Sequence, residues 1–113
     1  MEYNELEKRL IEFTDLVIGF MLDENIGSGD QMVSSASSAL TIYQSTRNIE
    51  NRSELRNKLE TVIDDLYETA FHLEVIKYSG SAQNESEALF LLKVCMELIF
   101  NIDEVIEINA ENP

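Results

Sequence analysis

The segment 88–102 constrains the fold more than any other part of this chain. It reads ALFLLKVCMELIFNI, and its only polar residues are Lys93, Glu97 and Asn101. A helix at the surface of a domain needs one apolar stripe, whereas this segment would be apolar around most of its circumference. We therefore expect it either to lie at the centre of several helices or to present a second apolar face to another subunit.

Four segments carry apolar residues at spacings of three and four, the period of an α-helix. Leu6, Leu10 and Phe13 begin such a stripe near the N-terminus. A glycine-containing polar stretch ends this segment, and Asp30 or Ser28 can cap the next one. The predicted helices span approximately residues 4–24, 30–47, 52–79 and 85–108.

Capping signals mark the boundaries of the last two helices. Asn51 is followed three residues later by Glu54, an arrangement that satisfies free amides at a helix start. Asn84 and Glu87 repeat the pattern before the fourth helix, and Gly80 is a suitable C-terminal cap for the third.

The connections between these helices are short, and the one proline is the terminal Pro113. No stretch alternates polar and apolar residues as a strand would. The sequence therefore predicts an all-α fold, a single up-down antiparallel four-helix bundle, in one domain spanning residues 1–113. Small side chains let helices approach closely, so we interpret the serines of the second helix as a tight packing surface; they are Ser34, Ser35, Ser37 and Ser38.

The third and fourth predicted helices carry more apolar residues than a core stripe requires. In the fourth, Phe90 and Phe100 flank Lys93 and Glu97, a pattern typical of a protein-contact patch. We expect these two rings to be exposed in an isolated chain and buried in an oligomer. The predicted oligomer interface comprises Ile63, Tyr67, Phe71, Leu89, Phe90, Met96 and Phe100.

The charge is strongly negative, with 22 acidic and 8 basic side chains and a formal net charge of −14. Such a chain repels phosphate backbones and anionic lipid surfaces, because affinity for both comes largely from Lys and Arg. We therefore expect no nucleic acid or membrane partner. A basic protein partner, a cation, or high solubility without any partner all remain compatible with this charge.

Cysteine content and the N-terminus favour a cytoplasmic location. Cys95 is the one cysteine and lies in the apolar run, which favours a packed thiol over a reactive one. The acidic N-terminus lacks the basic and apolar regions of a signal peptide. The run from Ala88 is also broken by charges and falls short of the roughly 20 residues that span a bilayer.

The residue inventory argues against catalysis and against a bound cofactor. A di-iron bundle needs two Glu-x-x-His pairs, but His72 is the one histidine and Glu68 lies four residues before it. We therefore expect no catalytic, cofactor-binding or metal-binding residues. For His72 we favour an interhelical hydrogen bond or a rim position over a proton switch or a ligand role. The acidic residues around Asp64 and Glu104 should form solvated faces.

Residues 31–74 contain three short runs that carry a family resemblance. They are Gln31-Met32-Val33-Ser34-Ser35-Ala36-Ser37-Ser38, Asn51-Arg52-Ser53-Glu54-Leu55 and Glu68-Thr69-Ala70-Phe71-His72-Leu73-Glu74. In register, they resemble motifs of the four-helix-bundle family encoded in 23S rRNA intervening sequences, whose relatives include accessory proteins of diversity-generating retroelements. The resemblance implies a four-helix bundle that oligomerises, with association to nucleic acid or to a nucleic-acid-handling protein.

Together these patterns predict a non-enzymatic, self-associating four-helix-bundle interaction module. Two alternatives stay open. The family resemblance suggests association with nucleic acid or docking on a nucleic-acid-handling protein, which the net charge of −14 disfavours. A metal-binding bundle is the other alternative, with Glu68 and His72 contributing to a site shared between subunits.

Overall fold

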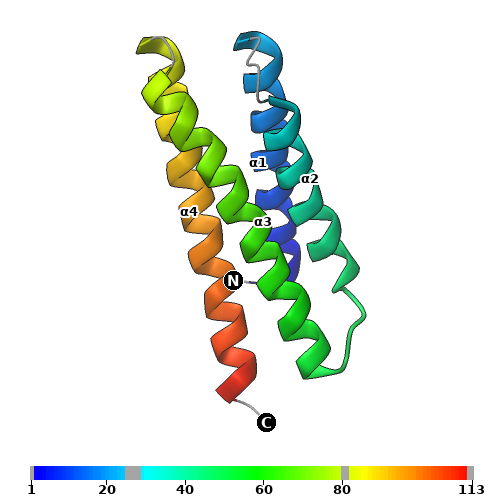
Figure 1. Cartoon of the computed structure of the whole chain (residues 1–113). Helices are drawn as coiled ribbons and strands as arrows, with labels where there is room; N and C mark the ends of the chain where they lie inside the picture. Colours follow the sequence, from blue (N-terminus) through cyan, green and yellow to red (C-terminus); the bar gives the residue numbers. More distant parts are fainter. Residues whose placement is uncertain (1, 25–28, 80–81, 112–113) are drawn as a thin grey trace.

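The computed structural model describes residues 2–24, 29–79 and 82–111, and within these ranges it contains four α-helices and no strand. Figure 1 shows them as neighbouring rods that run alternately up and down. The predicted fold class, an all-α antiparallel four-helix bundle, is confirmed. The helices are α1 (Tyr3–Glu24), α2 (Gly29–Ser45), α3 (Arg52–Ser79) and α4 (Ala82–Glu111).

Each helix packs against two others, so the bundle has a square cross-section. α3 lies between α2 and α4, and α1 contacts α2 and α4 (Figure 1). The Cα atoms extend over 49 × 20 × 20 Å, the shape expected of helices packed side by side along nearly their full length. No helix in the described ranges has both the length and the apolar character that a membrane crossing requires.

The core lies along the axis of the bundle and is built from one stripe of each helix. The predicted stripe of α1 is confirmed, because Leu6, Leu10 and Phe13 have at most 1% of their surface exposed. Cys95 is fully buried in the equivalent stripe of α4. The other helices contribute residues at the same helical spacing; they include Met32, Ala36, Ala39, Val62, Leu66, Leu73, Leu98 and Ile102.

The start of α3 shows the Asn51 half of the predicted capping arrangement. The backbone N–H of Glu54 donates a hydrogen bond to Oδ1 of Asn51 at 2.9 Å, which satisfies one of the free amides in the first turn. Asp30, one of the two caps predicted for α2, and Asn84, predicted for α4, are not caps, because α2 already begins at Gly29 and α4 at Ala82. Asp30 and Asn84 therefore lie inside first turns. Ser28 and Gly80 lie outside the described residues.

α2 ends two residues earlier than predicted. The N–H groups of Thr46 and Arg47 reach back only three residues, to the carbonyls of Tyr43 and Gln44. The Thr46 hydroxyl also donates to the Tyr43 carbonyl, at 2.6 Å. This tighter turn replaces the last α-helical turn that the apolar spacing suggested. α4 extends three residues beyond its predicted range at each end, 82–111 against 85–108.

Candidate functional site

The exposed apolar side chains gather on α3 and α4. All five exposed aromatic rings of the described residues lie on these two helices, whereas α2 exposes no large apolar side chain and α1 exposes only aliphatic ones. Phe71 and Phe100 each have 63% of their surface exposed. The large exposed residues of α3 and α4 are Tyr67, Phe71, Val75, Tyr78, Leu89, Phe90, Met96, Phe100 and Ile108.

A hydrogen bond between the two helices shows how these residues line up. The Cys95 thiol donates to the Leu66 carbonyl at 3.1 Å, so the two residues lie at one level of the bundle. Tyr67 and Met96 come directly after this pair, each one helical step of about 100° further round. Because α3 and α4 are antiparallel, both steps lead to the same outer side of the helix pair.

Six of the seven predicted interface residues share this outer side. Residues four or seven positions from Tyr67 and Met96 return to the same helical face. We call this set the α3–α4 face; it comprises Ile63, Tyr67, Phe71, Leu89, Met96 and Phe100. Five of these side chains are exposed, and Ile63 is partly buried against the core.

Phe90 lies elsewhere, and the structure separates it from Phe100. Although 57% exposed as predicted for an isolated chain, Phe90 is directed toward α1. It lines a hollow of about 310 Å³ together with Leu16, Gly19 and Phe20. A Cβ atom added to Gly19 would meet nothing within 4 Å, which agrees with open space at this point. Phe100 also lies beside α1 but lines a different hollow, so the two rings do not border the same hollow.

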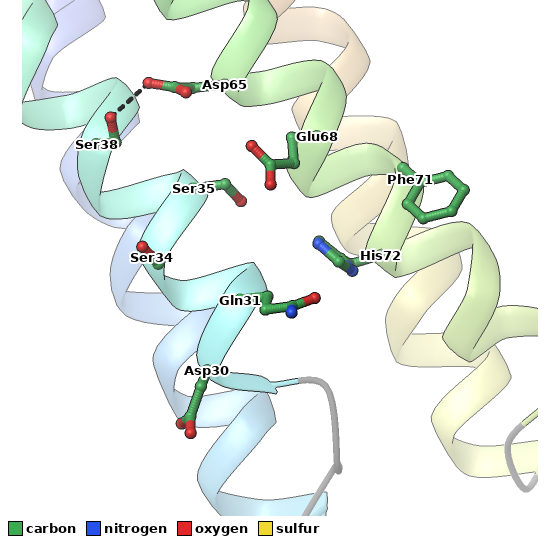
Figure 2. Close-up of a pocket in the computed structure, with 9 residues that line it drawn as sticks. All are labelled: Asp30, Gln31, Ser34, Ser35, Ser38, Asp65, Glu68, Phe71 and His72. Atoms are coloured by element: carbon green, nitrogen blue, oxygen red, sulfur yellow. Dashed lines mark hydrogen bonds between the residues drawn. The ribbon is translucent and has the colours of Figure 1, made fainter.

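A second hollow, polar in character, runs between α2 and α3 (Figure 2). It measures about 540 Å³, and Figure 2 shows Gln31 and His72 pointing toward each other across it. Its lining has three carboxylates and no Lys or Arg. The lining residues are Asp30, Gln31, Ser34, Ser35, Ser38, Asp65, Glu68, Phe71 and His72.

Hydroxyl groups tie the two helices together beside this groove. Ser38 donates to the Asp65 carboxylate at 2.6 Å, the contact dashed in Figure 2. Ser35 and Thr69 share a buried hydrogen bond, also of 2.6 Å. The tight packing predicted for the serine-rich stretch is thus present at Ser35, whereas Ser34 is exposed.

His72 lines this groove but is buried, which differs from the rim position that was one of the two placements favoured from the sequence. Only 9% of its surface is exposed, and its ring meets the Phe71 ring edge-on with centroids 5.6 Å apart. The interhelical hydrogen bond, the other favoured placement, is not found between His72 and the other described residues.

Cys95 is the one cysteine of the chain, and its buried thiol is not activated. Burial raises the pKa of the Cys95 thiol to about 12, although a backbone hydrogen bond at Ala70 opposes the shift. At neutral pH this thiol is protonated and therefore a poor nucleophile. Among the described residues, no three His, Cys, Asp or Glu side chains are grouped so that they could hold a metal ion.

A cluster of side chains joins the start of α1 to the end of α2, and the sequence analysis did not predict it. Tyr3 packs on Tyr43 with ring centroids 4.6 Å apart, and the guanidinium of Arg47 lies 4.8 Å above the Tyr3 ring. Arg47 also pairs with the Glu7 carboxylate at 2.9 Å. The signal available was weak, because Tyr43 is 40 residues from Tyr3 along the chain.

Comparisons with protein-family models, with curated proteins and with solved structures found no match to this chain. The resemblance to the 23S rRNA intervening-sequence family therefore stays a prediction drawn from the three short runs.

Proposed function

We propose that this chain is a non-enzymatic protein-interaction module that self-associates through the α3–α4 face. The observation that carries the proposal is that three of the five exposed aromatic rings of the described residues lie on this face, beside the exposed Leu89 and Met96; they are Tyr67, Phe71 and Phe100. Aromatic residues and Met are enriched at protein interfaces, and contiguous exposed apolar surface on a soluble domain marks an interaction site.

The energetic reason lies in what these side chains leave exposed. Tyr67, Leu89 and Phe100 each keep between 51% and 63% of their surface in water. Complete burial of a large apolar side chain is worth about 1.5–3 kcal/mol, so covering the exposed half contributes about 1 kcal/mol for each residue. A symmetric contact uses every such residue twice, once from each copy.

The charge distribution supports a protein partner over nucleic acid. The net charge of −14 opposes binding to a phosphate backbone. Several of the eight basic side chains are also engaged within the chain: Arg9 pairs with Glu97 at 3.4 Å and Arg56 with Glu60 at 3.0 Å. Such pairs reduce the positive charge that remains for contact with phosphate.

Light scattering coupled to size-exclusion chromatography, over about 5 to 500 µM chain, tests the proposal. The wild type should show a mass that rises with concentration. Phe100→Asp should shift the protein toward monomer, whereas Leu22→Asp should not, because Leu22 is 68% exposed on α1 and away from the α3–α4 face. Circular dichroism should show that both variants keep the helical fold.

Two results would overturn the proposal. One is a wild-type monomer throughout this concentration range. The other is tight, salt-sensitive binding of RNA by the purified protein, which would support the nucleic-acid alternative despite the charge.

A further inference from the structure

The outward side of α4 carries a regular seam that the core does not use. Six exposed residues follow one another at spacings of four, three, four, three and four. Residues at this spacing, with a period of 3.5, follow one face of a helix and can lie along a second helix packed against it. We call these residues the outer seam; they are Leu89, Lys93, Met96, Phe100, Asp103 and Glu107.

The outer seam is symmetric about the level of Leu98. Met96 and Phe100 lie two residues from Leu98 on either side, and Lys93 and Asp103 lie five residues from it. Leu89 and Glu107, nine residues away, complete the series. A helix with this spacing can meet an antiparallel copy of itself with each seam residue opposite a seam residue.

We propose that α4 pairs antiparallel with α4 of a second copy, about a twofold axis at the level of Leu98. Met96 then meets Phe100 of the second copy, and the Lys93 ammonium faces the second copy's Asp103 carboxylate. The twofold axis produces each contact twice. This pairing rests on the proposed self-association and specifies its geometry.

Charge selects the antiparallel arrangement. A parallel, in-register pairing would place Lys93 against Lys93 and Asp103 against Asp103 of the second copy, and like charges facing each other are repulsive. The antiparallel pairing replaces these two repulsions by two attractions.

Neighbouring side chains of α3 can enclose the contact. Tyr67 and Phe71 are exposed on the same outer side as Met96, beside the outer seam. In the paired arrangement they border the central apolar contacts and exclude water from them, as residues around an interface centre commonly do. At the seam end, the methylene groups of Glu107 cover Leu89 of the second copy while its carboxylate stays in solvent.

Charge reversal tests the pairing directly. Lys93→Glu and Asp103→Lys should each weaken the dimer at least tenfold in dissociation constant, and the double variant should return to within about threefold of wild type. Lys8→Glu is the matched control for Lys93→Glu, because it makes the same change of charge at an exposed position of α1. It should leave the dissociation constant within twofold of wild type.

Cysteine cross-linking tests the orientation. Under oxidation, a mixture of Met96→Cys and Phe100→Cys chains should form a disulfide between unlike chains faster than either variant forms one alone. Cys95 is buried and protonated, so it should not compete. Faster cross-linking of Met96→Cys with itself would overturn the antiparallel pairing.

The possible failures are distinguishable. A wild-type monomer at all concentrations removes both the proposed function and the pairing. If the wild type dimerises and neither Lys93→Glu nor Asp103→Lys changes the dissociation constant, the proposed function stands but the pairing is overturned. An assembly larger than two chains also overturns it, because a twofold contact closes with the second copy.

Discussion

Tyr3 and Tyr43 exchange hydrogen bonds across the α1–α2 interface. The Tyr3 hydroxyl donates to the Tyr43 carbonyl at 3.0 Å, and the Tyr43 hydroxyl donates to the Tyr3 carbonyl at 3.1 Å. The exchange links the first turn of α1 to the last turn of α2, two places where helices commonly fray.

Removing one of these hydroxyls should destabilise the bundle while keeping its packing. Tyr43→Phe retains the ring and loses one hydrogen bond, so we expect the free energy of unfolding to fall by about 1 kcal/mol. Urea denaturation followed by circular dichroism measures this change. Tyr78→Phe is the control, because Tyr78 is 79% exposed and should tolerate the loss. Equal stabilities of Tyr43→Phe and wild type would contradict the structural importance of the exchange.

The Asn51 cap should contribute measurably to stability. Asn51→Ala removes the acceptor for the Glu54 N–H and should lower the free energy of unfolding by about 1 kcal/mol. Asn51→Asp keeps a side-chain acceptor and should stay close to wild type. Thermal unfolding by calorimetry separates these variants, and an Asn51→Ala midpoint equal to that of Asn51→Asp would show that the cap is dispensable.

The buried thiol of Cys95 should make stability fall in alkaline solution. Its folded pKa of about 12 lies above the ordinary value of 9.0 because of burial. The unfolded chain loses this proton first, so the stabilising contribution is complete below pH 9 and is lost as the pH rises from 9 to 12. The slope it contributes to the free energy of unfolding approaches about 1.4 kcal/mol per pH unit in that window.

Comparison with Cys95→Ala isolates this contribution. Urea denaturation at pH 8, 9, 10 and 11 should give a shallower alkaline decline for Cys95→Ala than for wild type. Burial also raises the pKa of Tyr43, with the Tyr3 phenol and the Glu7 carboxylate adding to the shift and Arg47 opposing it. Both proteins share this second source of alkaline destabilisation. Parallel declines would show that the thiol does not titrate differently in the two states.

The Ser35–Thr69 contact should make stability sensitive to added side-chain volume and to the loss of its hydrogen bond. Ser35 can also donate to the Met32 carbonyl at 3.0 Å, so Thr69→Val leaves its hydroxyl with an acceptor. We expect that variant to cost about 1 kcal/mol. Ser35→Leu adds volume where α2 and α3 approach closely and should cost about 1–3 kcal/mol. Equilibrium urea unfolding of both variants measures these costs, and a Ser35→Leu protein as stable as wild type would contradict the prediction.

Helix positions and fold class were readable from local patterns. The apolar stripe that begins at Leu6 and the cap at Asn51 depend on residues within a few positions of one another, and both were found as predicted. The misplaced caps at Asp30 and Asn84 show the limit of this reasoning. A capping residue type also occurs inside a first turn, and the spacing alone does not say where the helix begins.

The candidate site was readable only in part. The surplus of apolar residues on α3 and α4 was visible in the sequence, and so was the expectation that Phe90 and Phe100 are exposed in a single chain. The sequence did not show that these two rings lie on different sides of α4. Their ten-residue separation leaves them about 80° apart around the helix, and only the packed structure shows that they line different hollows beside α1.

Across the whole molecule, patterns within single helices were predictable from the sequence, whereas contacts between helices were not. Periodicity, capping and composition act within single helices, and they were enough to establish four amphipathic helices in an antiparallel bundle. The Tyr3–Tyr43 exchange, the polar groove beside His72 and the alignment of Tyr67 with Met96 required the packed structure. Each of these depends on the rotation and level of one helix against another, which close packing of all four stripes determines together.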